Sequence, residues 1–331
     1  MKKLRLVLTL CLLAALLCPA ASAETVLKYA HMNTEDNTSG MYAQWFADRV
    51  EELSGGSIRV EVYPNSQLGS IQEMAEMVAA GTIQLHHNTW GGLSVIMEKL
   101  ELLDTPYLFA STEDAIRFND INNSPILQEY NQELIETAGV RVLNSIYGGA
   151  RELTCNKPVY SPADLSGVKI RAIPSPVYIT AVEGMGAIAV AVDWTDTPTA
   201  LVTGVVDGQE NPPVTIYTAN LQESQKYMMD TKHIIAVGPT VMNEQAYQAL
   251  TEEEQGWIDQ AAYETWEKFT QYSIDSENDY IQKLVDAGVT FITEEDGLKV
   301  DEFKASVDAL VAVNYAKYAD EYARISEWLG Y

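Results

Sequence analysis

The feature that most constrains the fold is a long stretch that no helix-breaking residue interrupts. Neither glycine nor proline occurs between positions 257 and 287, and Gly288 follows as a natural helix stop. Thr251 and Glu254 precede this stretch with the spacing of a capping box, which marks a helix start. At about 1.5 Å per residue, the helix would be roughly 45–55 Å long. A domain of about 150 residues has a radius of gyration of only about 15 Å. We therefore expect this helix to cross from one lobe to another, the alternative being a break near residues 273–276.

The N-terminal part of the chain alternates between strand and helix patterns. Strand patterns cover residues 26–31, 58–63 and 83–87, and helix patterns cover residues 41–53 and 71–80. This β-α-β order is typical of an α/β fold, in which helices cover both faces of a largely parallel sheet.

The same alternation continues further along the chain. Strands are expected over residues 141–146, 168–172 and 188–192, and helices over residues 177–182 and 195–202. The 331 residues suffice for two domains. No repeat or low-complexity linker marks a boundary between them.

The first residues have the layout of a secretory signal peptide. A basic start at positions 2–5 is followed by an apolar run from Leu6 to Leu17 and by small residues ending at Ala23. The apolar run is too short to span a bilayer comfortably. We expect residues 1–23 to be a signal peptide that is cut after Ala23, which would place the mature protein in the periplasm.

The charge of the chain excludes several classes of partner. The signal peptide would remove three of the 21 basic residues and none of the 47 acidic ones, which takes the formal net charge from −26 to −29. Such a surface repels nucleic acid and anionic lipid. We expect no nucleic-acid partner.

The sequence offers little enzyme or cofactor chemistry. It contains no G-x-S-x-G, G-x-x-x-x-G-K or H-E-x-x-H motif. Residues 184–189 match a dinucleotide fingerprint in letters, but a helix pattern precedes them and a strand pattern follows, which is the reverse of what that site requires. We expect neither an enzyme nor a cofactor.

Metal binding is also not indicated. His86 and His87 are adjacent, so on a strand they point to opposite faces and cannot chelate one ion without a bend. Cys155 is the single cysteine outside the signal peptide, which excludes an internal disulfide and a four-cysteine metal site.

Three polar residues are candidates for ligand binding. Arg171 lies near the carboxyl end of the 168–172 strand, and Arg151 follows a strand and the small-residue turn 148–150. In open α/β sheets, ligands bind outside the carboxyl ends of strands, and a guanidinium grips a carboxylate or sulfonate through paired hydrogen bonds. Asn211 lies in a turn before Pro212. For either arginine alone, a surface salt bridge is the competing interpretation.

Several longer motifs, in order, carry a resemblance to a known family. They are Tyr63-Pro-Asn-Ser-Gln-Leu-Gly69, Pro106-Tyr-Leu-Phe109, Gly149-Ala-Arg151, Asp164-Leu-Ser-Gly-Val-Lys-Ile-Arg171 and Gly204-Val-Val-Asp-Gly-Gln-Glu-Asn-Pro212. Over almost its whole mature length the chain resembles the solute-binding proteins of TRAP transporters, the tripartite ATP-independent periplasmic systems.

The resemblance implies a periplasmic binding protein with two α/β lobes, a ligand cleft between them and a long helix that spans both. The expected first lobe comprises residues 24–148 and about 237–276, and the second comprises residues 149–236 and about 277–331. The protein is then a monomer that binds a small organic anion by hinge closure and delivers it to the membrane subunits of a TRAP permease.

The resemblance also assigns roles to residues. Arg171 matches the arginine that makes the main paired contact with the substrate carboxylate, Arg151 and Asn211 match two further polar contacts, and Trp194 matches a cleft aromatic. Residues near two other strand ends complete the expected site, namely His31, Asn33, Asn88, Thr89 and Trp90. Trp90 has core packing as its alternative.

The chain departs from the family pattern at two places. Residues 195–198 replace the usual S-E-V-Y segment, and residues 88–92 lack the charges that sialic-acid-binding members place there. A sialic acid ligand is therefore not expected, whereas dicarboxylates, keto, hydroxy or sugar acids, aromatic acids and sulfonates stay open.

Two rival functions belong to other classes. One is a ligand sensor that signals to a receptor, and the other is a periplasmic hydrolase or lyase that uses acidic residues of the same cleft. Adjacent permease genes would favour transport and an adjacent histidine-kinase gene would favour sensing, while turnover of a bound compound would reveal an enzyme.

Overall fold

The computed structural model describes residues 24–331, so the expected signal peptide lies outside the described residues. The strands are β1 (Thr25–Ala30), β2 (Ile58–Tyr63), β3 (Leu85–His87), β4 (Val140–Cys155), β5 (Lys169–Ala172), β6 (Ile188–Ala191), β7 (Gly208–Asn211), β8 (Tyr227–Asn243) and β9 (Thr290–Ile292). The α-helices are α2 (Thr38–Ser54), α3 (Ile71–Ala79), α4 (Thr112–Phe118), α5 (Pro125–Ala138), α6 (Pro176–Gly184), α7 (Thr197–Val202), α8 (Pro213–Thr218), α9 (Glu244–Gln248), α10 (Glu252–Asp286), α11 (Val300–Asn314) and α12 (Ala319–Leu329). Short 3-10 helices include η1 (Gly91–Val95), η2 (Glu98–Asp104), η3 (Pro162–Leu165), η4 (Trp194–Asp196) and η7 (Ala316–Tyr318).

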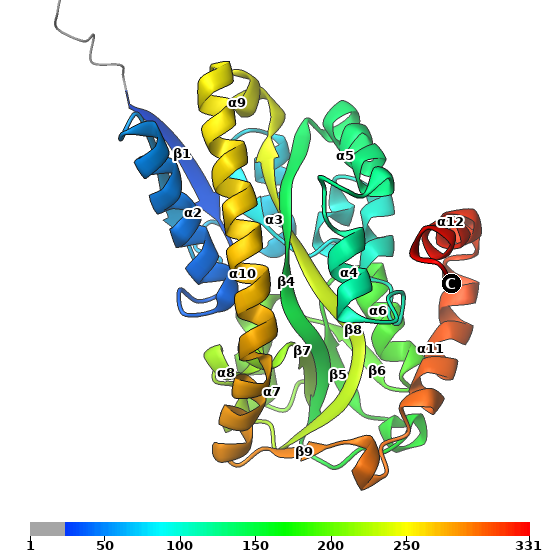
Figure 1. The fold of residues 1–331 in the computed structure, drawn as a ribbon. Coiled ribbons are helices and arrows are strands. Elements are labelled where there is room, and N and C mark those ends of the chain that lie inside the picture. The colour runs from blue at the N-terminus through cyan, green and yellow to red at the C-terminus, as the bar shows by residue number, and fades with distance from the viewer. Residues whose placement is uncertain (1–23) are drawn as a thin grey trace, which may run out of the picture.

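One mixed sheet forms the centre of the molecule (Figure 1). Eight of its nine strands follow the order β2-β1-β3-β8-β4-β7-β5-β6, and the ninth, β9, pairs with the start of β8. Strands at the two ends pair in parallel, as the β-α-β order predicts. The centre differs from the expected parallel sheet, because β8 pairs antiparallel with β3 and β4, and β4 pairs antiparallel with β7.

Two long strands connect the halves of this sheet. β4 and β8 pair along almost their whole lengths, from Val140↔Asn243 to Cys155↔Tyr227. The glycines at 148 and 149, which sequence patterns place in a turn, instead lie inside β4 at a bulge, where the register shifts between Tyr147 and Gly149. An extra residue in one strand of an antiparallel pair bends that strand and raises its local twist. The prediction of a strand end and turn before Arg151 is therefore wrong.

The long helix is present and continuous. α10 has 35 residues and the predicted capping box, in which the Thr251 side chain accepts from the Glu254 N–H and Glu254 accepts from the Thr251 N–H. Figure 1 shows α10 running along the length of the sheet. Its first half contributes Ile258 and Phe269 to a core with α2, β1 and β2, and its end contributes Leu284 to a core with α7 and α8. The α/β prediction with a spanning helix is confirmed.

Among residues 24–331, no helix is both long enough and apolar enough to cross a membrane.

Candidate functional site

A cavity lies where the two long strands pass between the halves of the sheet. It offers about 90 Å³ to the centres of water-sized molecules, and one water needs only about 10–15 Å³ of such space. The cavity therefore has room for a small solute. Its wall draws on segments far apart in the sequence, from α2, β3, β4, β5, α6, β7 and β8.

Seven of the nine predicted site residues line this cavity. They are Asn33, Asn88, Thr89, Arg151, Arg171, Trp194 and Asn211. The structure thus brings together residues that the sequence spreads over almost 180 positions.

Arg171 is the distinctive group of the cavity. It lies on β5, where its side chain is 1% exposed. Its Nε donates to the Val192 carbonyl at 2.9 Å, whereas its buried Nη2 has no hydrogen-bond partner. Within residues 24–331, no carboxylate oxygen lies within 4.0 Å of this guanidinium. Burial lowers the pKa of Arg171 to about 10, so the group stays positively charged at neutral pH.

Trp194 lies beside this cation. The Cζ of Arg171 is 5.7 Å from the centre of the Trp194 ring, within the range of a cation–π contact. Trp194 belongs to η4, which begins where the Asp193 side chain accepts from the Trp194 N–H. The aromatic side chain and the unpaired cation thus lie next to each other in the cavity lining.

Arg151 differs from Arg171 because it already has a counter-ion. It is 3% exposed on β4, and its Nε and Nη2 donate to the two Glu210 carboxylate oxygens at 2.5 and 2.8 Å. His233 Nε2 lies 3.1 Å from the same carboxylate. Burial alone would raise the pKa of Glu210, but Arg151 lowers it to about 2. The positive charge of Arg151 is thus neutralised by a buried carboxylate.

The amide side chains of the wall are held by the protein itself. Asn211 ends β7 and donates to Gln209 at 2.6 Å. Asn88 donates to the Ile71 carbonyl and accepts from the Thr89 N–H, and Asn33 donates to the Ser39 hydroxyl. These contacts fix the orientation of polar groups that face the cavity.

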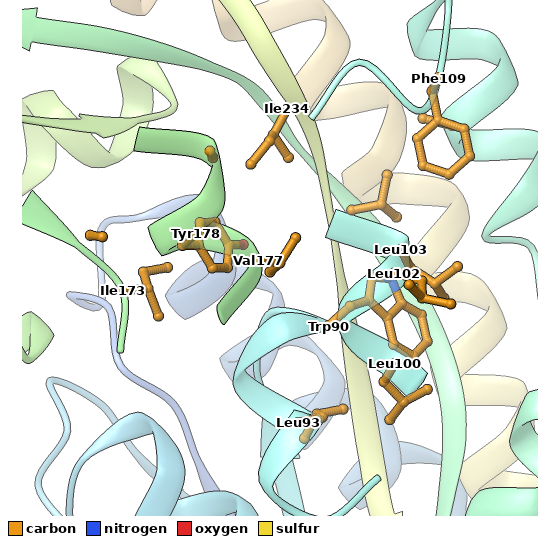
Figure 2. Close-up of a cluster of buried hydrophobic side chains, with 14 of the residues drawn as sticks. Trp90, Leu93, Leu100, Leu102, Leu103, Phe109, Ile173, Val177, Tyr178 and Ile234 are labelled. Carbon is orange, nitrogen blue, oxygen red and sulfur yellow. The ribbon is translucent and has the colours of Figure 1, made fainter. Parts of the chain in front are cut away.

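Two predicted residues lie outside the cavity lining. Trp90 is fully buried in the hydrophobic core with Leu100, Leu102 and Leu103 (Figure 2). Its indole N–H donates to Asn119 at 2.8 Å, which leaves the side chain no path to a ligand and corresponds to the core-packing alternative. His31 is buried beside a separate pocket of the first half, between β1 and α2.

Several cavity residues have no signal in the sequence. Asp104, at the end of η2, accepts from the Tyr178 hydroxyl at 2.8 Å and from the Gly91 N–H at 2.7 Å. His87 also lines the cavity, and burial lowers its pKa well below the usual value, so its ring is neutral. The chain has 47 acidic residues, and no local sequence pattern shows which of them are buried. Neither Asp104 nor Glu210 could therefore be distinguished from the others.

Residues 24–331 contain no group of three or more His, Cys, Asp or Glu side chains with the arrangement of a metal site.

Comparison with known proteins gives this cavity a context. Residues 29–317 match the family model of DctP, bacterial extracellular solute-binding protein, family 7. A solute-binding protein from Roseobacter denitrificans is 31% identical over 307 residues, which are 91% of this chain and 92% of that protein. The crystal structure of this TRAP periplasmic solute-binding protein with bound L-galactonate superimposes with a TM-score of 0.85, covering 93% of this chain and 99% of the solved chain.

Two further relatives have a similar extent. The 2,3-diketo-L-gulonate-binding periplasmic protein YiaO from Escherichia coli is 30% identical, over 86% of this chain and 85% of that protein. A TRAP periplasmic solute-binding protein from Bordetella bronchispeptica, with density assigned to pantoate, is 28% identical with a TM-score of 0.83, covering 91% of this chain and 98% of that one.

These relatives are periplasmic binding proteins of transporters and not enzymes, which confirms both the predicted function class and the predicted two-lobed binding-protein fold. The chain belongs to the DctP family of bacterial extracellular solute-binding proteins, family 7, which serve TRAP transporters.

Proposed function

We propose that this protein captures a small organic carboxylate or sulfonate between two lobes and delivers it to the membrane subunits of a TRAP permease. The observation that carries the proposal is the buried, unpaired guanidinium of Arg171 in the cavity. A buried charge without a counter-ion costs several kcal/mol. An anionic ligand would supply that counter-ion.

The ligand class follows from the same charge and from the relatives. L-galactonate, 2,3-diketo-L-gulonate and pantoate, which the names of the relatives give, are all carboxylates. Here the carboxylate would pair with Arg171 and lie beside Trp194. Asn33, Asn88, Thr89 and Asn211 would contact the remainder of the ligand, and Arg151 would shape the wall through its pair with Glu210.

Hinge closure between two lobes is the mechanism of capture. The proposed first lobe comprises residues 24–148 and about 237–276, and the second comprises residues 149–236 and about 277–331. The chain crosses between the lobes at residues 148–149 on β4 and at residues 236–237 on β8. These two crossings lie opposite each other in the paired strands, since Gly149 pairs with Ala236 at the bulge. A ligand that contacts both lobes favours the closed state by its differential affinity.

One helix suggests an amendment to these boundaries. α12 belongs to the second lobe by sequence position, but its contacts go to the first lobe. Glu321 accepts from the Tyr130 hydroxyl at 2.8 Å, and the Arg324 guanidinium pairs with Glu129 at 2.5 Å. We assign α12 to the first lobe, which makes η7 a further crossing between the lobes.

The proposal also covers export and assembly. Residues 1–23 would be removed as a signal peptide by cleavage after Ala23, and the mature protein would act as a monomer. Mass spectrometry of protein recovered from the periplasm, together with size-exclusion chromatography, tests both statements.

Calorimetric titration tests the anion site. The mature protein is titrated with L-galactonate, 2,3-diketo-L-gulonate, pantoate, a dicarboxylate series and sulfonates, after unfolding and refolding to remove carried-over ligand. Arg171→Ala should weaken binding of any anion that binds by about 2–5 kcal/mol. Lys169→Ala is the matched control, because it removes a positive charge from the exposed start of the same strand. Equal affinities of wild type and Arg171→Ala, or binding of neutral sugars alone, would refute the proposal.

A further inference from the structure

A hydrogen bond between two ionisable side chains joins the two walls of the cavity. The Tyr178 hydroxyl, on α6 of the second lobe, donates to Asp104 Oδ2, at the end of η2 in the first lobe, at 2.8 Å. Other links between the lobes here are neutral: Gln72 donates to the Pro174 carbonyl at 2.8 Å, and Asn37 donates to the hydroxyls of Thr215 and Thr218, both at 3.2 Å.

The contact between the two lobes at this point is close. Asp104 is 2% exposed and Tyr178 is 1% exposed, and both line the ligand cavity. A Cβ atom built on Gly91 would lie 2.9 Å from Cε2 of the Tyr178 ring, so η1 of the first lobe packs directly on α6 of the second. Figure 2 shows Tyr178 on α6 and Trp90 and Leu93 on the neighbouring segment. Opening the lobes would therefore separate Tyr178 from Asp104 and expose both to water.

The charged groups around Asp104 are few. Gly91 donates its N–H to the same carboxylate oxygen at 2.7 Å. Arg151 on β4 and Glu210 on β7 act on Asp104 with opposite signs, and they neutralise each other as a pair. Tyr178 is the titratable residue that α6 contributes. Burial and, second to it, the nearby Asp104 carboxylate raise the pKa of Tyr178 well above the usual value, so its hydroxyl stays protonated and donates the hydrogen bond.

We propose that Tyr178 and Asp104 form a proton-linked latch that joins the lobes directly and contributes to closure independently of the ligand. The latch rests on the proposed lobes and hinge. In the open state Asp104 is a hydrated carboxylate. In the closed state it is buried, it receives two hydrogen bonds, and it shares a cavity with the proposed anion.

Protonation of Asp104 should therefore favour closure. Burial raises the pKa of Asp104 in the closed structure to about 6, although the bonds from Gly91 and Tyr178 act in the opposite direction. A hydrated aspartate has a pKa of about 3.9. Because the closed state binds the proton more tightly, lowering the pH from 8 towards 5 shifts the equilibrium towards closure, by about tenfold for a difference of this size.

Other titrating groups require a difference measurement. His87 lines the same cavity from β3, and its ring is neutral in the closed state. Exposure of His87 on opening would favour the open state at low pH, which opposes the effect of Asp104. Comparison of the wild type with Asp104→Asn isolates Asp104, because His87 is the same in both proteins.

Distances between the lobes test the latch without any ligand. Spin labels are attached at Gln67→Cys in the first lobe and Thr199→Cys in the second, both exposed positions, while the native Cys155 is buried and does not react. Pulsed electron resonance then gives the closed fraction at pH 5.5 and pH 8. The variants are Tyr178→Phe, which keeps the ring, and Asp104→Asn, which keeps an acceptor but cannot titrate.

The expected result has three parts. Between pH 8 and pH 5.5, the closed-to-open ratio of the labelled but otherwise unsubstituted protein rises several-fold relative to that of Asp104→Asn. Asp104→Asn keeps only the opposing contribution of His87, so its closed fraction falls over the same pH change, and Tyr178→Phe lowers the closed fraction at pH 8 more than at pH 5.5. Tyr247→Phe is the matched control, since its hydroxyl donates to Asp259 at 2.8 Å away from the cavity.

A closed fraction that changes with pH equally in the wild type and Asp104→Asn, or that Tyr178→Phe leaves unchanged, would overturn the latch. Circular dichroism and the urea midpoint of each variant separate a loss of folding from a shift in closure. The result is independent of the anion site, because no ligand is present. If the latch is absent, the proposed role of Arg171 in anion binding is unaffected. If no anion binds, closure by the latch can still be measured.

Discussion

The carboxylate of Glu277, in the last third of α10, accepts a hydrogen bond of 2.8 Å from the Tyr147 hydroxyl on β4. Its other oxygen accepts from the Ala150 N–H at 2.7 Å. Between these two donors lies the β4 bulge, where Gly149 has a φ of +109°, a conformation that favours glycine. One side chain of the spanning helix thus holds both sides of the bulge where β4 passes from one half of the sheet to the other.

Removal of this carboxylate should destabilise the protein. Tyr147 is 1% exposed, so its hydroxyl cannot turn to water when Glu277 is replaced. We expect Glu277→Ala to lower the free energy of unfolding by about 2–4 kcal/mol, because two donors lose a charged acceptor. Urea unfolding followed by circular dichroism measures the change.

Asp279→Ala is the control for this substitution. Asp279 lies two residues further along α10 and is exposed. Its replacement by alanine removes the same charge from the same end of the helix. Its effect should stay within about 0.5 kcal/mol. Equal effects of the two alanine substitutions would show that the contacts of Glu277 contribute nothing.

The buried pair of Arg151 and Glu210 leads to a second prediction. Replacing Arg151 with Met leaves the Glu210 carboxylate, which is fully buried, with His233 Nε2 at 3.1 Å as its remaining side-chain hydrogen-bond partner. Loss of one partner of a buried pair costs about 3–5 kcal/mol, whereas replacing both partners by apolar groups costs far less. We expect Arg151→Met to be strongly destabilising and Arg151→Met with Glu210→Met to recover much of the loss. Additive effects in a double-mutant cycle of unfolding free energies would contradict this.

Local sequence signals predicted the outer elements well. Gly55 ends α2 in the left-handed conformation, and the side chains of Ser70 and Glu73 form the predicted capping box at the start of α3. The length of α10 followed from the absence of helix breakers and from the Thr251 cap. Each of these signals depends on residues a few positions apart, so it can be recognised in the sequence without knowledge of the tertiary structure.

The centre of the sheet could not be predicted in the same way. Gly148 and Gly149 have turn chemistry, but the long pairing of β4 with β8 holds them in a strand as a bulge. That pairing joins residues about 70 to 100 positions apart. Register between distant strands depends on packing of both partners, which a local pattern does not contain.

The site shows the same division. Arg151 and Arg171 look alike in the sequence, because each is a single arginine near a strand. They differ because antiparallel pairing of β4 with β7 brings Glu210 to Arg151, whereas no carboxylate reaches Arg171 within the described chain. Trp90 could not be placed either, since its burial depends on the leucines of η2 and on Asn119.

Gly238 gives a third prediction, at the cavity wall. A Cβ atom at this position would lie 2.4 Å from His87 Cε1 and 2.9 Å from the Asn88 carbonyl oxygen. Gly238→Ala must therefore displace two residues that line the cavity, at a cost of about 1–3 kcal/mol in unfolding free energy. Gly148→Ala is the matched control, because Gly148 also lines the cavity but its nearest neighbour would be 3.8 Å away. Thermal unfolding of both variants checks the prediction, and a Gly148→Ala loss as large as that of Gly238→Ala would contradict it.

His86 gives a prediction about pH. It is fully buried on β3, and its Nδ1 lies 2.9 Å from the Ala30 carbonyl oxygen, which can only accept, so Nδ1 carries the proton. Burial lowers the pKa of His86 to about 4, although this hydrogen bond acts in the opposite direction. In the unfolded chain the pKa is about 6.5.

The sign of the effect follows from these two values. Between pH 6.5 and pH 4 the unfolded chain binds up to one more proton at this position than the folded protein, so stability falls as the pH falls through this window. The full loss from a pKa lowered to about 4 is about 3 kcal/mol. Above about pH 7.5 the ring is neutral in both states and the contribution does not change.

His86→Asn separates this contribution from those of the other titrating groups. The Asn amide can donate to the Ala30 carbonyl but does not titrate. The difference between the two proteins therefore reports the proton that binds to His86, together with the effect of its charge on His31 and His87. Urea unfolding at pH 7.5, 6.5, 5.5 and 4.5 gives the free energy for each protein. We expect the wild type to lose about 2.5 kcal/mol more than His86→Asn between pH 7.5 and pH 4.5, because this window ends just above the folded pKa. A difference between the two proteins that does not vary with pH would mean that His86 is protonated equally in the folded and unfolded states, and its burial would then have no electrostatic consequence.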